Sequence, residues 1–195
     1  MRERDNGLAP QIAESGRPGS TRRRPLIADA ALFGVPLLVS FAALGQPPCG
    51  ALTPRDMEGP FYKAGAPTRG SLVEPGTKAE RLVLSGRVLS RGCKPIANAS
   101  LDFWHADEKG DYDNAGYRYR GRVATDGEGR YRLETILPAL YPGRPRHIHV
   151  KVQAATGGRI LTTQLYFRDE QRGPLSLATE RREGVLRAAF DFVLQ

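Results

Sequence analysis

Two of the chain's three histidines lie in one nine-residue stretch that also holds a phenol and two guanidinium groups, Tyr141-Pro142-Gly143-Arg144-Pro145-Arg146-His147-Ile148-His149. In a β-strand, residues i and i+2 point to the same face. His147 and His149 would therefore present their imidazoles together, while Ile148 would face the other way. Paired imidazoles beside a phenol can bind a metal ion. The His-x-His tripeptide alone fits an ordinary exposed strand face better, because short motifs often occur by chance.

Three further segments carry side chains that such a metal site could use. In chain order they are Glu58-Gly59-Pro60-Phe61-Tyr62, Phe103-Trp104-His105-Ala106-Asp107-Glu108-Lys109-Gly110-Asp111-Tyr112 and Leu161-Thr162-Thr163-Gln164-Leu165-Tyr166-Phe167. Together with the first stretch they resemble the intradiol ring-cleavage dioxygenases, the non-haem iron enzymes that include catechol and protocatechuate dioxygenases. The resemblance runs from about Leu52 to Phe167, and it is specific because the separated motifs occur in the same order.

The resemblance implies one non-haem Fe(III) per chain, held by two tyrosines and two histidines. The matching residues are Tyr112, Tyr141, His147 and His149. Fe(III) is a hard ion that suits anionic oxygen donors, and its charge can remove the proton of a phenol whose ordinary pKa is about 10. Since these ligands complete the site, we expect His105 to be a strand-end histidine hydrogen-bonded to the backbone.

The resemblance also implies the substrates and the catalytic residues. The family cleaves a catechol-type ring with O2, between the two hydroxylated carbons, to a cis,cis-muconate-type product. The catalytic positions match Arg144, Gln164 and Tyr141, and the substrate-binding positions match Gly59, Pro60, Phe61 and Arg144. In the family the substrate displaces the tyrosine that matches Tyr141. A permanently charged guanidinium is suited to stabilise negative charge that develops on the ring.

One departure from the family concerns the loop between the second tyrosine and the first histidine. It is only Pro142 to Arg146, shorter than in the well-known catechol and protocatechuate enzymes. That loop borders the substrate, so the identity of the catechol stays open, as does the oligomeric state. The alternative function is a non-catalytic β-sandwich binding module, transthyretin-like or carbohydrate-binding, because fold does not fix function. The complete ligand set, together with Arg144 and Gln164, favours the enzyme.

The periodicity of the sequence from Arg81 onward predicts strands. Leu82 and Leu84 alternate with more polar residues, Val150 and Val152 continue the His147 strand, and Asp126-Gly127-Glu128-Gly129 has the composition of a hairpin turn. Short strands separated by Gly and Pro turns predict an all-β fold, an antiparallel β-sandwich. Little helix is expected, apart from a possible turn in one range, Thr179 to Arg187. We interpret four tyrosines as packing residues: Tyr117, Tyr119, Tyr131 and Tyr166.

Residues 1–45 predict an export signal and leader, which leaves 46–195 as the dioxygenase domain. The sequence Thr21-Arg22-Arg23-Arg24-Pro25 precedes an apolar run from Ala30 to Leu44, a layout that resembles a twin-arginine signal. This predicts a periplasmic or secreted protein. The apolar run is short for a membrane span of ~20 residues, so we expect no stable span in the mature form. An N-terminal helix of the core is the alternative.

Charge and cysteine content bound the remaining possibilities. The formal net charge is +8, but the arginines are scattered rather than gathered in a basic run with aromatics, so nucleic acid is not an expected partner. The two cysteines are Cys49 and Cys93. In an exported protein such a pair can form a disulfide, and the sequence leaves that pairing open.

Overall fold

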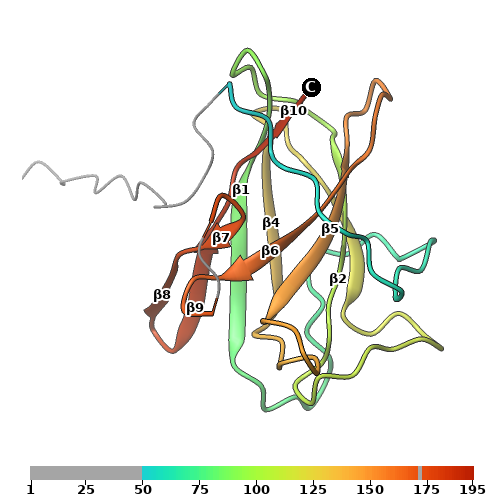
Figure 1. The fold of residues 1–195 in the computed structure, drawn as a ribbon, viewed down its shortest axis with the longest axis vertical. Helices are drawn as coiled ribbons and strands as arrows, with labels where there is room; N and C mark the ends of the chain where they lie inside the picture. Colours follow the sequence, from blue (N-terminus) through green and yellow to red (C-terminus); the bar gives the residue numbers. More distant parts are fainter. Residues whose placement is uncertain (1–49, 171–172) are drawn as a thin grey trace, which may run out of the picture. The chain divides into compact units, whose positions relative to one another are not determined.

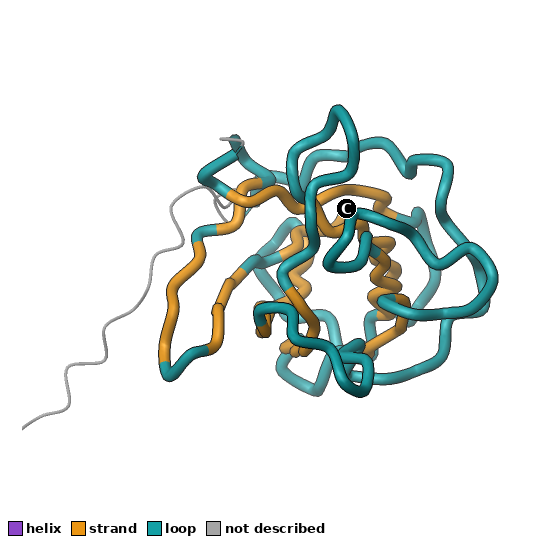
Figure 2. The backbone as a smooth tube through the Cα atoms, turned by 90° about the horizontal axis from the view of Figure 1, so that it is seen from below, coloured by secondary structure: helices purple, strands orange, loops and turns teal. Residues whose placement is uncertain are grey.

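The computed structural model describes residues 50–170 and 173–195, so the predicted export segment lies outside the described residues. The described residues form strands and loops without a helix (Figure 2). The strands are β1 (Arg81–Ser90), β2 (Ser100–Trp104), β3 (Arg120–Ala124), β4 (Arg130–Ile136), β5 (His147–Gln153), β6 (Leu161–Phe167), β7 (Ser176–Leu177), β8 (Thr179–Arg182), β9 (Val185–Ala189) and β10 (Phe192–Leu194).

The strands form two sheets of five strands each (Figure 1). In the first sheet, β1 pairs with β4 along one edge. Along its other edge β1 pairs first with β9 and then with β10, and β8 pairs with the far edge of β9. The second sheet has the order β3-β2-β5-β6-β7. The prediction of an all-β sandwich is confirmed. Both sheets are mixed, because β1–β9, β1–β10 and β6–β7 are parallel pairs within an otherwise antiparallel arrangement.

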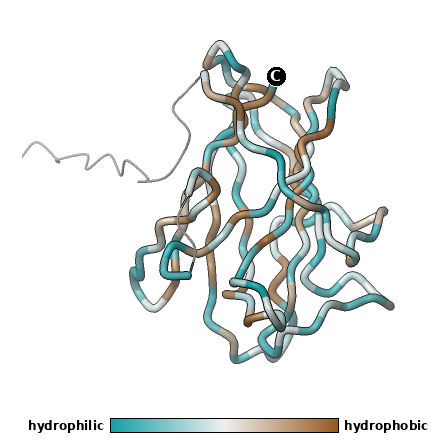
Figure 3. The backbone as a smooth tube through the Cα atoms, in the orientation of Figure 1, coloured by the Kyte–Doolittle hydropathy of each residue, from teal (hydrophilic) through white to brown (hydrophobic). Residues whose placement is uncertain are grey.

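Period-two alternation builds the core, since every second residue of a strand points to the same face. Figure 3 shows hydrophobic stretches interspersed with hydrophilic ones along the strands. The core cluster takes side chains from both sheets, including Leu82, Leu84, Leu101, Phe103, Ile148, Val150 and Leu165. The same alternation leaves the opposite face of β5 and β6 free to carry polar side chains.

A close backbone approach at Gly86 fixes how the last two strands join β1. A Cβ atom at this position would lie 1.8 Å from the Phe190 carbonyl oxygen, so only glycine fits. The Phe190 amide donates to the Ser85 carbonyl at 2.9 Å, and the Arg87 amide donates to the Asp191 carboxylate at 2.7 Å. These contacts carry the chain from β9 to β10 along one edge of β1.

The two predicted turns have different outcomes. The Asp126–Gly129 turn joins β3 and β4, with the Gly129 amide donating to the Asp126 carbonyl at 3.0 Å, as predicted. The prediction of a helical turn near Thr179 to Arg187 is wrong, because this segment is the β8–β9 hairpin. Glu183 and Gly184 have positive φ angles of 51° and 74°, which fits a two-residue type I′ turn between paired strands.

Two further observations concern membrane-spanning helices and the cysteines. Within residues 50–170 and 173–195, no helix has the length and apolar character that a membrane crossing requires. Cys93 is disulfide-bonded. Cys49, the other cysteine of the sequence, lies outside the described residues, so the pairing of the two stays a prediction.

Candidate active site

Strand β5 presents the two imidazoles on one face. Ile148 and Val150 belong to the core cluster, so the residues that alternate with them, His147 and His149, point away from it. All of these residues are nevertheless buried, because loops and residues 53–61 cover the outer face of the sheet. The sequence prediction that the two histidines share a face is confirmed.

Neighbouring strands continue the row of site residues. His149 lies opposite Trp104 on β2 and opposite Gln164 on β6, and residues directly opposite each other share a face. The indole of Trp104 stacks on the His149 ring at a centroid distance of 4.8 Å and an angle of 5°. His147 lies opposite Tyr166 in the next row of the same two strands, β5 and β6.

Two loops bring the predicted tyrosine ligands together. The Ala139 amide donates to the Asp107 carbonyl at 3.0 Å, which joins the loop before Tyr141 to the loop before Tyr112. Gly110, with a φ of 93°, lies so close to this second loop that a Cβ atom would be 2.4 Å from the Leu140 carbonyl oxygen. The rings of Tyr112 and Tyr141 consequently lie 5.9 Å apart in an edge-on arrangement.

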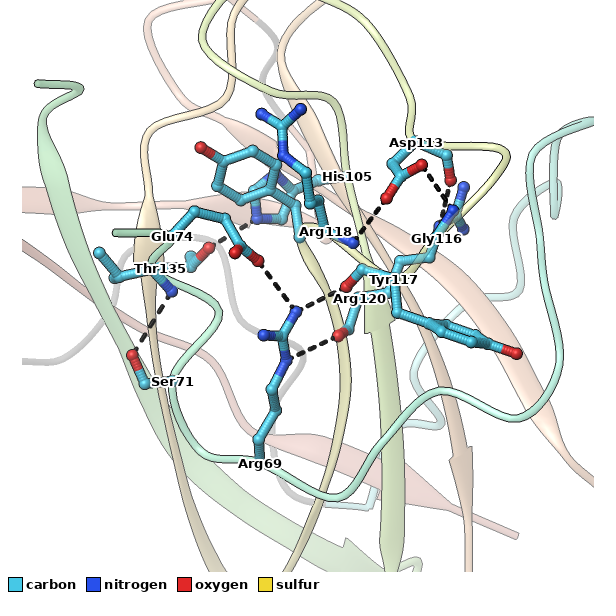
Figure 4. Close-up of polar contacts among 12 residues, drawn as sticks. Arg69, Ser71, Glu74, His105, Asp113, Gly116, Tyr117, Arg118, Arg120 and Thr135 are labelled. Atoms are coloured by element: carbon cyan, nitrogen blue, oxygen red, sulfur yellow. Dashed lines mark hydrogen bonds and ion pairs between the residues drawn. The ribbon is translucent and has the colours of Figure 1, made fainter. Parts of the chain in front are cut away.

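The loop after Tyr112 is closed by local hydrogen bonds. The Asp113 carboxylate accepts the amides of Ala115, Gly116 and Arg118 at 2.7–3.1 Å. Figure 4 shows this carboxylate at the Gly116 and Arg118 amides, and the Arg69 guanidinium donating to the carbonyls of Tyr117 and Arg120 farther along the chain. The loop that carries Tyr112 is thus fixed at both ends.

The short loop between Tyr141 and His147 begins with a tight turn. The Arg144 amide donates to the Tyr141 carbonyl at 2.9 Å, and Gly143 has a φ of 76°. Proline at the first central position and a glycine with positive φ at the second are the residues of a type II turn. This turn returns the chain so that Arg144 lies next to the site.

Residues 53–61, which precede the first strand, cross in front of β6 and β5 (Figure 1) and are bonded to β6 at Thr162 and Gln164. The Phe61 ring stacks on Tyr112 with centroids 4.4 Å apart. Gly59 lies against the metal-ligand candidate His149, where a Cβ atom would be 3.2 Å from the ring carbon Cε1. The buried Arg120 guanidinium joins the segment to the Tyr112 loop, donating to the Phe61 carbonyl at 2.6 Å and to the Asp113 carbonyl at 3.0 Å.

Three of the predicted ligand atoms converge on one point. The Tyr112 phenol oxygen lies 3.2 Å from Nε2 of His147 and 3.2 Å from Nε2 of His149, and these two nitrogens are 3.0 Å apart. Donor atoms held ~2.1 Å from one metal ion at roughly right angles lie about 3.0 Å apart. The spacing of these atoms therefore fits a shared metal ion. Tyr141 joins the group through its ring contacts with Tyr112 and Phe61.

The protonation states also suit metal binding. His147 Nδ1 lies 2.7 Å from the Pro145 carbonyl, which can only accept, so in the neutral ring the lone pair is on Nε2. Burial, followed by the charges of His147 and Arg144, lowers the pKa of His149 to about 2. Burial also lowers the pKa of His147 and raises the pKa of Tyr112, the latter opposed by the charges of Arg120 and Arg144. The imidazoles are neutral donors, and a cation is needed to remove the phenol proton.

The donor set, two phenols and two imidazoles, suits a hard trivalent ion such as Fe(III). Nowhere in the described part of the chain do His, Cys, Asp and Glu side chains form a group of three that could hold a metal ion, so the candidate site depends on its tyrosines. The donor atoms of Tyr112, His147 and His149 lie within 3.0–3.2 Å of one another, and the Tyr141 ring lies against the Tyr112 ring.

Arg144 reaches the same site from its turn. Its Nη2 atom donates to Gln164 Oε1 at 3.0 Å and to the Tyr166 hydroxyl at 3.3 Å, and its Nη1 atom lies 3.0 Å from Met57 Sδ. Gln164 is fully buried and donates through Nε2 to the Met57 carbonyl at 2.7 Å. The structure thus brings the predicted catalytic residues Arg144 and Gln164 into direct contact.

Tyr166 is the polar site residue that the sequence interpretation missed. Its ring packs with the core, as predicted, but its hydroxyl donates to Asp56 Oδ2 at 2.7 Å and accepts from Arg144. Its position two residues after Gln164 in a strand was a signal for the same face. Asp56, at the start of the covering segment, was also not selected.

His105 and the other tyrosines behave as expected. His105 is buried and bonds through Nδ1 to the Ala106 carbonyl at 2.7 Å and through Nε2 to Thr135 Oγ1 at 2.6 Å (Figure 4). The other three tyrosines that were interpreted as packing residues bond away from the site: Tyr117 donates to the Ala64 carbonyl, Tyr119 to Glu108 and Tyr131 to the Phe190 carbonyl.

Sequence comparison identifies the family of the chain. The model of the family described as Dioxygenase matches residues 57–194. Catechol 1,2-dioxygenase of Acinetobacter baylyi is 33% identical over 163 residues, covering 69% of this chain and 52% of the relative. The protocatechuate 3,4-dioxygenase beta chain of Burkholderia cepacia is 36% identical over 139 residues, covering 58% of each chain. The chain spans about half the length of the catechol dioxygenases it matches.

Solved structures give the same result. The dioxygenase domain of a dioxygenase carbohydrate-binding protein fusion from Streptomyces sp. SirexAA-E has a TM-score of 0.71 and 44% identity, covering 74% of this chain and 99% of that domain. Catechol 1,2-dioxygenase from Pseudomonas arvilla C-1 has a TM-score of 0.65 and 30% identity, covering 73% of this chain and 62% of that protein. The fold and the family match agree, and the chain belongs to the intradiol ring-cleavage dioxygenase family.

Proposed function

We propose that the protein is a non-haem Fe(III) dioxygenase that cleaves a catechol-type ring between its two hydroxylated carbons with O2. The observation that carries this proposal is the convergence of the Tyr112 oxygen with Nε2 of His147 and of His149 at 3.0–3.2 Å. Fe(III) held by these residues and Tyr141 would bind the two tyrosines as phenolates, after loss of their protons, and would accept electron density from a bound catecholate.

The residues around the ligands have separate roles in this proposal. The Phe61 ring, stacked on Tyr112, forms a wall for a flat aromatic substrate. Gly59 lets that wall approach His149. The phenolate oxygen of Tyr141 takes a proton from the incoming catechol. The Arg144 guanidinium stabilises the negative charge that develops on the ring, and Gln164 holds the guanidinium in place.

The relatives suggest the range of substrates to test. Matching proteins are named as catechol, chlorocatechol and protocatechuate dioxygenases. The loop Pro142 to Arg146, which borders the proposed substrate position, is a tight turn in this chain. We therefore propose catechols as the substrate class, with their ring substituents to be determined.

The test uses purified protein expressed with iron. Oxygen uptake is followed with catechol, protocatechuate, hydroxyquinol and chlorinated catechols, and the products are identified. A broad visible charge-transfer band and a colourless muconate support the proposal, and Tyr112→Phe should bleach or shift the band. A colourless protein that carries stoichiometric zinc under these conditions, or a yellow semialdehyde product, would show that the proposal is wrong.

We also propose that the protein is exported, with residues 1–45 as a twin-arginine-type signal. Supporting this, Cys93 is disulfide-bonded, and disulfides persist in oxidising compartments. Replacement of Arg22, Arg23 and Arg24 by lysine should retain the protein in the cytoplasm. Recovery of the uncleaved parent chain from the cytoplasm of its native host would contradict export.

A further inference from the structure

We propose that Asp56 and Tyr166 act as a pair of positioning residues that fix the direction of the Arg144 guanidinium. This inference rests on the proposed function, because it assigns Arg144 the role of stabilising charge on the substrate. Asp56 lies one residue before the range matched by the family model, and neither member of the pair is a metal-ligand candidate.

The Asp56 carboxylate is itself held in place. Its Oδ1 atom accepts the amide of the next residue, Met57, at 2.7 Å. The Asp56 amide donates to the Thr162 carbonyl on β6 at 3.0 Å. Both the backbone and one carboxylate oxygen are therefore fixed, and the free oxygen, Oδ2, is directed at Tyr166.

The hydroxyl proton of Tyr166 can serve only one acceptor well. Asp56 Oδ2 lies 2.7 Å from the Tyr166 oxygen, whereas Gln164 Oε1 lies 3.1 Å from it. The Asp56 carboxylate is the preferred acceptor, because it is closer and because charge-assisted hydrogen bonds are about twice as strong as neutral ones. The Tyr166 proton is therefore directed to Asp56, and the lone pairs of the phenol oxygen are left for a donor.

That donor is Arg144. Its Nη2 atom donates to Gln164 Oε1 at 3.0 Å and to the Tyr166 oxygen at 3.3 Å. Gln164 and Tyr166 are buried, and in such surroundings a satisfied hydrogen bond is stronger than in water. The two acceptors, 3.1 Å apart, define one direction for the guanidinium.

Removal of the Asp56 carboxylate changes this arrangement. The Tyr166 proton would turn to Gln164 Oε1, its remaining neighbour, and compete with Arg144 for the same oxygen. Gln164 cannot turn to compensate, because its Nε2 atom is bound to the Met57 carbonyl at 2.7 Å. Arg144 would then lose its fixed direction although the metal ligands stay in place.

The experiment compares Asp56→Ala, Tyr166→Phe and the double variant in the iron-loaded protein. We expect kcat to fall about tenfold in each, less than the 10²–10³ typical for loss of the stabilising donor itself. Iron content and the visible band should be unchanged, and KM should change less than kcat. The double variant should be no slower than either single variant, since both break one contact chain. In Asp56→Asn the amide oxygen would stay on the Met57 amide and the NH2 group would face Tyr166, so this variant should be as slow as Asp56→Ala.

A charge control and a crystal structure complete the test. Glu180→Ala removes an exposed carboxylate of the β8–β9 hairpin, where its partner is Arg182, so it should leave kcat nearly unchanged. In crystals of the Asp56→Ala variant, the Arg144 guanidinium should leave Gln164 Oε1. An Arg144 that keeps its parent orientation there would overturn the inference. A parent protein without ring-cleaving activity would instead overturn the proposed function. The two outcomes are distinguishable, because the crystal structure shows the direction of the Arg144 guanidinium whether or not the protein is active.

Discussion

Replacement of Arg144 by alanine should separate catalysis from metal binding. Arg144 bonds through its guanidinium to Gln164, Tyr166 and Met57, and its bond to a candidate ligand is made by its backbone amide, to the Tyr141 carbonyl. We therefore expect Arg144→Ala to keep its iron and its visible colour. Its turnover should fall by about 10²–10³, or ~2.7–4 kcal/mol of transition-state stabilisation, which is typical for removal of one preorganised donor.

Arg146→Ala is the matched control, because it removes an arginine two residues away. The Arg146 guanidinium bonds to Glu170 at 2.6 Å, with 31% of its side chain exposed. A partly exposed ion pair of this kind contributes about 0.2–1 kcal/mol to stability, so the loss should be small. The Arg146 amide would still donate to Glu170 and hold the strand start.

The assay measures three quantities on the parent and both variants: iron content, the visible spectrum and oxygen uptake at saturating catechol. Arg144→Ala should lose at least about tenfold in kcat with full iron content, while Arg146→Ala should stay within about threefold of the parent. Equal rates in the two variants would refute the assignment of Arg144. Loss of iron in Arg144→Ala would show that it supports the ligands instead.

Three further predictions concern the scaffold and the site. Gly86→Ala should prevent folding, since its Cβ atom would lie 1.8 Å from the Phe190 carbonyl oxygen; a cooperative thermal transition like the parent's would contradict this. Gly59→Ala should weaken iron binding, because its Cβ atom would lie 3.2 Å from Cε1 of His149 at a φ of +71°, and iron titration measures this effect. Burial lowers the pKa of His105 from 6.5 to about 4, so the unfolded state binds the proton more readily. The stability due to neutral His105 should be complete above pH 6.5 and be lost as the pH falls toward 4. Denaturant unfolding of the metal-free protein should show a smaller pH slope for His105→Gln, and an unchanged slope would count against the buried histidine.

The sequence predicts those parts of the site that depend on strand periodicity. His147 and His149 share a face of β5 because alternation has a fixed period of two, whereas Gln164 on β6 was selected by the family resemblance. The choice of Tyr112 and Tyr141 needed the family resemblance, since periodicity carries no information about which loop tyrosine approaches a strand. Their proximity depends on tertiary contacts such as the fit of Gly110 against Leu140.

The parallel partners of β1 and the role of Tyr166 show two different limits of sequence reasoning. A strand's alternation fixes its buried face but not its neighbour, so β9 and β10 beside β1 could not be read from the pattern. Tyr166 was assigned to packing because an aromatic side chain in a strand usually fills a core, and its ring does so. A tyrosine, however, carries an apolar ring and a polar tip, and a buried hydroxyl must find a partner. Because Tyr166 follows Gln164 by two residues, that partner had to lie on the polar face, where the segment containing Asp56 and the Arg144 turn meet.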